Sequence, residues 1–225
     1  MPYHACYLCG ADSANGEDFC FPCLAELPWN AHACRGCAVP LTTPGTDYCR
    51  QCLSQPAAFE HCFVPMKYDT PIDLMLLRYK QYADEHAGAI LGRLLLNALP
   101  SSAFDLLCDS AVIAVPMFTA DLRRRGFNPA HQLASNLAKK LALPINYQLF
   151  CQRQHDPQKG LSAAQRRRNL HGVFRFEGKA PEHCLIVDDV MTTGATVQTV
   201  AAELKRQGTE CVSVVCLART PSPND

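Results

Sequence analysis

The chain has 225 residues, of which 48% are hydrophobic and 19% are charged, and its formal net charge at pH 7 is zero. This composition can bury a sizeable core and excludes an intrinsically disordered protein, while the length alone allows one domain or two. The N-terminus has no basic stretch followed by an apolar one, and no run approaches about 18 apolar residues, so neither a secretory leader nor membrane insertion is indicated. We therefore expect a cytoplasmic protein.

The zero net charge hides an uneven distribution of charge along the chain. Residues 1–62 hold two Arg and six acidic residues, whereas residues 63–225 hold nineteen Lys and Arg and fifteen acidic residues. The segment from Arg123 to Arg168 holds ten basic residues and one acidic residue, Asp156. Such a concentration of positive charge indicates an anionic partner; the alternative interpretation is a solvated basic face.

Eight of the fourteen cysteines form four CxxC pairs near the start of the chain. Two thiolates separated by two residues hold one Zn²⁺ from a tight turn, and a second pair completes a tetrahedral site. A redox-active CxxC is expected once, not four times at a regular spacing, and a reducing compartment disfavours disulfides. We therefore predict two closed structural zinc sites that fold this segment. In the preferred sequential arrangement one ion is held by Cys6, Cys9, Cys20 and Cys23 and the other by Cys34, Cys37, Cys49 and Cys52; an interleaved arrangement also satisfies the chemistry.

The cysteine-rich segment predicts a first domain at residues 1–62, and the remainder, residues 63–225, predicts a second. In the second domain, apolar residues recur at helical spacing in some segments and form short β-branched runs in others. One or two helices are expected at residues 71–99, and one helix each from 128 to before Pro144 and from 195 to 207. Strands are expected at residues 110–115, 145–151, 183–187 and 211–217. This alternation predicts an α/β fold with a mainly parallel sheet flanked by helices.

The eleven residues VDDVMTTGATV, residues 187–197, lie where a predicted strand gives way to a helix. Ligands of parallel sheets bind beyond the carboxyl ends of the strands, at helix N-termini. Backbone N–H groups of residues 193–196 and the threonine hydroxyls are suited to a phosphate, and the carboxylates of Asp188 and Asp189 to vicinal hydroxyls or a hydrated Mg²⁺. The pattern predicts a phosphorylated sugar as the ligand. The alternative is an exposed acidic turn before a threonine-capped helix.

The longer segment LIVDDVMTTGATV resembles the signature of type I phosphoribosyltransferases, which bind 5-phosphoribosyl-1-pyrophosphate (PRPP). Two further segments, VPMFTADLRRRGFNPAHQLA at residues 115–134 and LSAAQRRRNLHGVF at residues 161–174, resemble the ComF family. That family joins a zinc ribbon to a phosphoribosyltransferase domain and is associated with bacterial competence and the uptake of transforming DNA. The resemblance extends over nearly the whole chain, the cysteines included.

The resemblance implies a role for individual residues. Asp188 and Asp189 are implied as the catalytic pair, meeting the ribose hydroxyls and, through water, Mg²⁺. The pyrophosphate is implied at the loop that contains Pro116 and Met117, with Arg123 and Arg125 as candidates to neutralise it. The residues implied to hold the 5-phosphate are Thr192, Thr193, Gly194, Ala195 and Thr196.

The reaction implied by the resemblance is the displacement of pyrophosphate from C1 of the ribose by a nitrogen nucleophile, with the polar residues 152–160 closing over PRPP. No residue identifies the acceptor base, so the sequence leaves open whether the chain is an enzyme.

Three interpretations of the function remain. The first is a PRPP-binding competence factor that binds single-stranded DNA and works with other competence proteins. The second is a phosphoribosyltransferase of nucleotide metabolism, and the third is a non-catalytic zinc adaptor for protein partners. The candidates for contacts to DNA are Arg124, Lys159, Arg166, Arg167 and Arg168.

Overall fold

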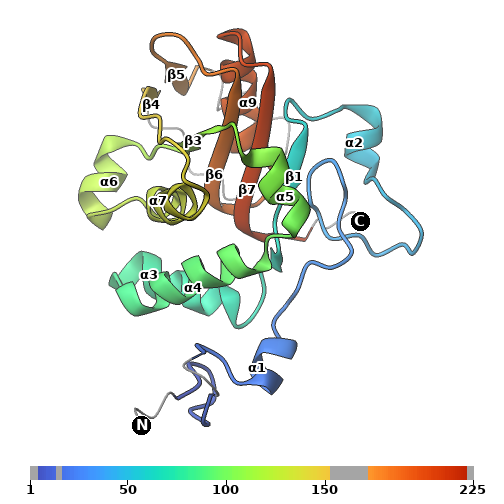
Figure 1. Cartoon of the computed structure of the whole chain (residues 1–225), viewed down its shortest axis with the longest axis vertical. Helices are drawn as coiled ribbons and strands as arrows, with labels where there is room; N and C mark the ends of the chain where they lie inside the picture. The colour runs from blue at the N-terminus through green and yellow to red at the C-terminus, as the bar shows by residue number, and fades with distance from the viewer. Residues whose placement is uncertain (1–4, 14–16, 153–171, 222–225) are drawn as a thin grey trace.

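The computed structural model describes residues 5–13, 17–152 and 172–221. Its centre is a parallel five-stranded sheet with the strand order β1-β7-β6-β3, in which β2 also pairs with β7 (Figure 1). The strands of this sheet are β1 (His61–Phe63), β2 (Met66–Lys67), β3 (Ala111–Ala114), β6 (His183–Met191) and β7 (Cys211–Arg219). A separate antiparallel pair is formed by β4 (Leu149–Cys151) and β5 (Phe174–Phe176).

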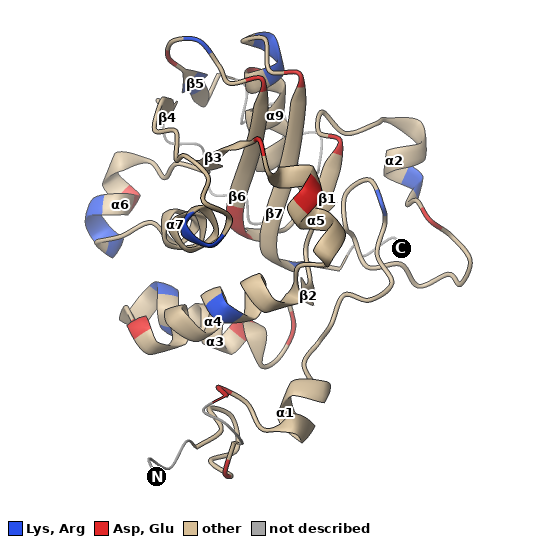
Figure 2. Ribbon diagram, viewed as in Figure 1, with Lys and Arg blue, Asp and Glu red and all other residues tan. Residues whose placement is uncertain are grey.

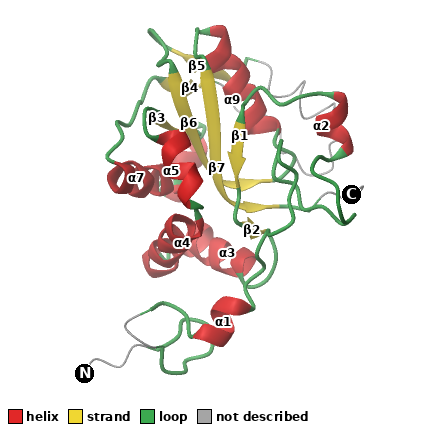
Figure 3. Ribbon diagram, turned by 45° about the vertical axis from the view of Figure 1, so that its right-hand side comes forward, coloured by secondary structure: helices red, strands yellow, loops and turns green. Residues whose placement is uncertain are grey.

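Helices cover both faces of the sheet, as the alternating pattern predicts (Figure 3). Along β6, Leu185 and Val187 belong to the core beneath α7, whereas Cys184 and Ile186 belong to the core beneath α9. A strand that is buried on both faces needs apolar residues at successive positions, which explains the continuous apolar run before Asp188. The first face carries α3 (Ile72–Tyr82), α4 (Glu85–Ala98), α5 (Ser101–Leu107) and α7 (Pro129–Leu141), and the second carries α9 (Ala195–Arg206).

The helices α4 and α5 contribute apolar side chains to the core. Leu91 and Leu95 of α4 are 1% exposed, and Leu107 of α5 is fully buried. No single helix in the described residues combines the length and the apolar composition that a membrane span requires; α4 and α5 meet that criterion only as a pair, bent by 92° between them.

The region 71–99 forms two helices, within the prediction of one or two, because Ala83 has a left-handed φ of 52° and Asp84 then caps α4 by accepting a hydrogen bond of 3.0 Å from the Ala87 N–H. Other predicted elements differ from the structure. The prediction of a strand at residues 145–151 is wrong for its first half. Ile145 makes only an isolated parallel bridge to Val112, and β4 then pairs with β5 away from the main sheet. In the described part of the chain after the cysteine-rich segment, two helices were not predicted, α5 and α6 (Thr119–Arg125).

The strand β6 is longer than its apolar run. The sequence predicts that it ends at Val187, but it continues to Met191 and includes Asp188 and Asp189. It continues because β7 extends equally far, so Val190 pairs with Ala218 and Met191 with Arg219. Backbone pairing with a neighbouring strand therefore overrides the change from apolar to acidic side chains.

The cysteine-rich segment forms two small units, which we call the first ribbon (residues 5–13 and 17–25) and the second ribbon (residues 33–54). Each ends in a short helix that begins directly after a cysteine, α1 (Phe21–Ala25) and α2 (Arg50–Ser54). The first ribbon contacts α4, where Arg93 donates two hydrogen bonds of 2.7 and 2.6 Å to Asp18. The second ribbon lies beside the sheet near β1 (Figure 1). The division into residues 1–62 and 63–225 stays a prediction, and β1 extends across it.

Two glycines of α4 differ in what surrounds them. At Gly88 a Cβ atom would stand 2.4 Å from the ring of Tyr79. That ring is only 5% exposed and packs against Phe127, with the ring centroids 4.8 Å apart, so it has no room to move. At Gly92, one turn later, the nearest atom would be Nδ2 of Asn136 at 2.7 Å, the end of a side chain that can rotate.

We predict opposite effects of the same substitution at these two positions. Gly88→Ala should lower the free energy of unfolding by about 1–3 kcal/mol through overpacking. Gly92→Ala should leave it unchanged or raise it by up to about 1 kcal/mol, because alanine favours the helix. Urea unfolding of both variants measures the difference, and equal effects would show that Tyr79 is not the rigid obstacle described.

Candidate functional site

Two adjacent carboxylates lie near the carboxyl end of β6. Asp189 is 9% exposed, and its Oδ1 lies 2.9 Å from Nζ of Lys80 on α3. A buried carboxylate needs a partner, and the ammonium group of Lys80 provides one inside the fold. Lys80 therefore places a positive charge directly beside the acidic pair.

The second carboxylate, Asp188, has a different electrostatic environment. Burial raises the pKa of Asp188 to about 7, and the negative charge of Asp189 contributes to the rise. The Asp189 backbone N–H donates a 2.9 Å hydrogen bond to Oδ1 of Asp188 and opposes the shift. A carboxyl group with such a pKa changes charge near neutral pH, and a bound cation or hydroxyl donor would favour its ionised form.

The turn after β6 leads directly into the N-terminus of α9. Gly194 occupies the N-cap position with a φ of 76°, a left-handed conformation that glycine adopts without strain. Met191 and Ala195 are buried, whereas Thr192 is exposed and Thr193 and Thr196 are half-buried. The first backbone N–H groups of a helix this long, with its dipole, form a site suited to an anion. We call residues 192–196 the threonine loop.

A buried arginine holds the start of the threonine loop. Arg219, the last residue of β7, is 5% exposed, and its Nη1 donates to the carbonyl oxygens of Met191 at 3.0 Å, Thr220 at 3.1 Å and Thr192. Its Nε donates a 3.1 Å hydrogen bond to the carbonyl oxygen of Cys37 in the second ribbon. Arg219 thus connects the sheet, the threonine loop and a zinc-site cysteine through one guanidinium group.

The second ribbon also lies against the other side of the threonine loop. A small cavity of about 80 Å³ there is lined by Cys37, Cys52, Thr193 and Gly194, among other residues. The side-chain carbonyl of Gln198 on α9 accepts a 3.0 Å hydrogen bond from the Ala58 N–H, in the segment that follows the ribbon. The threonine loop therefore contacts the second ribbon as well as the sheet.

The loop after β3 contains the residues for which the resemblance implies pyrophosphate binding. Nη1 of Arg125 lies 3.8 Å from Sδ of Met117, so this guanidinium is directed toward the loop. Arg123 and Arg124 are exposed on α6, and Nη2 of Arg124 is 3.0 Å from Oδ1 of Asp121. Of the three consecutive arginines, the structure brings Arg125 to Met117.

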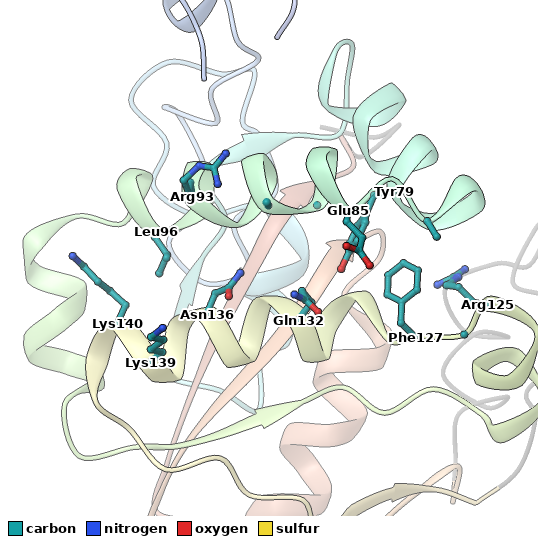
Figure 4. Close-up of a pocket in the computed structure, with 14 residues that line it drawn as sticks. Tyr79, Glu85, Arg93, Leu96, Arg125, Phe127, Gln132, Asn136, Lys139 and Lys140 are labelled. Atoms are coloured by element: carbon teal, nitrogen blue, oxygen red, sulfur yellow. The ribbon is translucent and has the colours of Figure 1, made fainter. Parts of the chain in front are cut away.

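A groove of about 990 Å³ lies between α4 and α7. Figure 4 shows Gln132 and Asn136 directed from α7 toward α4, with Arg93 and Leu96 on the opposite wall. One end of the groove is formed by Tyr79, Glu85, Arg125 and Phe127, and the other by Lys139 and Lys140.

The eight paired cysteines form two clusters in the predicted sequential arrangement. In each of the groups Cys6, Cys9, Cys20, Cys23 and Cys34, Cys37, Cys49, Cys52, all sulfur atoms lie within 4.8 Å of one another. Tetrahedral Zn²⁺ with bonds of about 2.3 Å holds its sulfur ligands about 3.8 Å apart. The Sγ atoms of Cys9 and Cys20 are 3.6 Å apart and those of Cys37 and Cys49 3.7 Å apart, so both clusters fit Zn²⁺. The sequential prediction is confirmed.

Lys80 and Arg219 were not predicted as site residues. Lys80 is one basic residue of an amphipathic helix, and nothing in its local sequence indicates a partner more than a hundred residues away. Arg219 follows the apolar run CVSVVCLA, and a charged residue at the carboxyl end of a buried strand is a signal that could have found it. Residues 153–160 of the expected closing segment, together with Lys159, Arg166, Arg167 and Arg168, lie outside the described residues.

Comparisons with known proteins match both parts of the chain. Residues 122–225 match the model of the phosphoribosyl transferase domain, and residues 1–53 match that of the double zinc ribbon domain. The DNA utilization protein YhgH of Salmonella typhimurium is 32% identical over 220 residues, 96% of each chain, and that of Escherichia coli K12 is 31% identical over 222 residues, also 96% of each. Competence protein F of Haemophilus influenzae is 30% identical over 180 residues, 77% of this chain and 79% of its own.

We predict that neutralising Asp188 stabilises the protein increasingly as the pH rises. The folded state raises the pKa of this group to about 7, so the folded protein retains a proton that the unfolded chain loses near pH 4. The contribution of Asp188 to the free energy of unfolding is therefore most favourable at low pH. It falls as the pH rises and stops falling above about pH 7. The gain from Asp188→Asn, measured by urea unfolding without Mg²⁺, should grow by about 1–2 kcal/mol between pH 5.5 and pH 8. Asp105→Asn, at an exposed carboxylate, is the control, and an equal trend in both would contradict the assignment.

Zinc content tests the pairing of the clusters. The wild-type protein should contain two zinc ions per chain by atomic emission, in line with the two cysteine clusters. Cys34→Ser combined with Cys49→Ser should leave one ion, because both residues belong to the second cluster, whereas interleaved pairing would damage both sites. Cys108→Ser, at an exposed cysteine outside the clusters, should leave the zinc content unchanged.

Proposed function

Because the chain belongs to the ComF family, which joins a double zinc ribbon to a phosphoribosyltransferase domain, we propose that it acts in the uptake or use of DNA during natural competence and binds PRPP beside β6. The names of its relatives, DNA utilization protein and competence protein F, support the biological role. The observation that carries the proposed ligand is the acidic pair in β6, followed directly by a loop that ends at a helix N-terminus.

The proposed arrangement of PRPP follows from the charges at the site. The threonine loop receives the 5-phosphate through the N-terminus of α9, and Asp188 and Asp189 accept hydrogen bonds from the ribose hydroxyls. Since PRPP carries several negative charges, two carboxylates alone would repel it. Lys80, 2.9 Å from Asp189, and Arg125 beside Met117 supply the compensating positive charge.

Magnesium fits the same edge of the sheet. Carboxylate oxygens are the hard donors that Mg²⁺ prefers, and Mg²⁺ usually binds through one or two carboxylates together with the phosphates of the substrate. Bound in this way, it would neutralise charge on the pyrophosphate. The part of this chain is to hold PRPP and to orient C1 of its ribose, with Arg125 facing the pyrophosphate.

The proposal is confined to PRPP binding in a competence factor, because no described residue is assigned to an acceptor. Transfer would require a nitrogen nucleophile to form a bond to C1 while the bond from C1 to pyrophosphate breaks. The contact between the second ribbon and the threonine loop favours a PRPP-linked role over that of a separate zinc adaptor, since Arg219 joins the two.

We predict that calorimetry will detect PRPP binding that strengthens when Mg²⁺ is present. Asp188→Ala combined with Asp189→Ala should weaken it by at least about 100-fold, because two charged acceptors of hydrogen bonds are lost. Asp105→Ala combined with Asp109→Ala removes two exposed carboxylates elsewhere and should bind PRPP as the wild type does.

Unchanged binding by the Asp188 and Asp189 variant, in a folded and zinc-loaded protein, would show that the site is wrongly assigned. A pyrophosphate-release assay over a panel of bases and single-stranded DNA then separates the two roles of the site. Release with one acceptor would identify a transferase, and binding without release would identify a sensor of PRPP.

A further inference from the structure

The groove between α4 and α7 is separate from the threonine loop, and Arg125 at one end is its only lining residue that the proposed binding of PRPP uses. It has a volume of about 990 Å³. Small residues on α4 and on the turn before it, among them Ala83, Gly88 and Ala89, leave it open. Its floor carries the amides of Gln132 and Asn136 (Figure 4). Such a floor can donate and accept hydrogen bonds without adding charge.

The walls of the groove carry more positive than negative charge. Four basic residues line it, Arg93, Arg125, Lys139 and Lys140, against one acidic residue, Glu85. Arg93 is compensated by Asp18 of the first ribbon. Within the part of the chain that the structure describes, neither exposed lysine pairs with a carboxylate. Figure 2 shows basic residues on α4, α6 and α7, the helices that contribute Arg93, Arg125, Lys139 and Lys140 to the lining of the groove.

The spacing of these charges favours a ligand with several phosphates. The α-helix rises 1.5 Å per residue, so Gln132 and Lys140 are about 12 Å apart along α7. Arg125 also lines the groove, at the end opposite Lys140. A mononucleotide has its phosphate at one end only and cannot reach both ends. A nucleic acid strand carries a phosphate at every nucleotide along its length, so one strand can meet the basic residues at both ends of the groove.

The aromatic residues favour recognition of the backbone over the bases. Tyr79 and Phe127 form the aromatic end of the groove, but their rings pack against each other and Tyr79 is 5% exposed. Stacking platforms for bases need exposed ring faces. The axes of packed helices are about 8–10 Å apart. A double helix, whose major groove alone is about 12 Å wide, cannot enter between them, whereas a single strand can lie along the groove.

We propose that the groove between α4 and α7 binds the sugar-phosphate backbone of single-stranded DNA, with Lys139 and Lys140 at one end and Arg125 at the other. This inference rests on the proposed function, which supplies DNA as the ligand. It adds a location distinct from the exposed Arg124. It also places one end of the strand at Arg125, beside the loop proposed for pyrophosphate.

Anisotropy of a labelled oligothymidylate, titrated at about 50 and 200 mM salt, tests this groove. Lys139→Gln combined with Lys140→Gln should weaken binding about tenfold and lower the magnitude of the salt slope by about 1.4, because each lost phosphate contact contributes about 0.7 on a single strand. Arg175→Gln combined with Lys179→Gln is the matched control, with the same change of charge at exposed positions outside the groove.

A steric variant tests the location without changing charge. Ala89 is exposed and lines the groove, so Ala89→Trp should obstruct a bound strand and weaken DNA binding at least about tenfold. Ala202→Trp, on the exposed side of α9, should have no effect on DNA binding. Both variants and the lysine variant should bind PRPP as the wild type does, which shows that the fold is intact.

The outcomes separate the groove from the proposed function. If the wild type binds the oligonucleotide and the groove variants bind it equally well, the groove inference is wrong and the proposed function stands. If the wild type binds no single-stranded DNA, the groove inference is wrong, whereas the proposed binding of PRPP is tested separately by calorimetry and is not affected. Displacement of the oligonucleotide by thymidine monophosphate at equal concentration would also overturn the inference, because the groove would then hold a small ligand.

Discussion

The arrangement of the site depends on the parallel pairing of β6 with β7 beyond the apolar part of either strand. Because the pairing continues to Met191 and Arg219, both acidic residues become part of a rigid sheet, and Arg219 comes within hydrogen-bonding distance of the carbonyl groups at the start of the threonine loop. Its guanidinium also reaches the backbone of Cys37. A single buried cation with several fixed donors can hold three segments at once, which a flexible ammonium group does less well.

The same edge of the sheet brings opposite charges together at short range. Asp189 is neutralised by Lys80, whereas Asp188 has no such partner in the described structure and has a raised pKa as a result of burial. Leaving a carboxyl group in this state reduces stability at neutral pH. Such a loss is common where a protein retains a group for binding instead of for folding.

The two ribbons are connected to the two surfaces proposed for ligands. The first ribbon contacts α4 through Asp18 and Arg93, and Arg93 lines the groove proposed for DNA. The second ribbon contacts the threonine loop through Cys37 and Arg219. Since a small cysteine-rich segment is folded by its metal, zinc contributes to the geometry of both surfaces although it lies in neither.

The amino-acid sequence alone determined those features that depend on short spacings. The CxxC pairs identified the zinc ligands, the alternation of apolar runs identified a parallel sheet with helices on both faces, and the motif at residues 187–197 identified the acidic pair and the loop after it. Each of these is written within a few residues, where the geometry of a turn, a strand or a helix relates position directly to chemistry. The tertiary structure alone decided which distant residues complete the site. Lys80 and Arg219 reach it from α3 and β7, and the groove exists only because α4 packs beside α7. Strand pairing and helix packing join residues far apart in the chain, and no local pattern records such contacts.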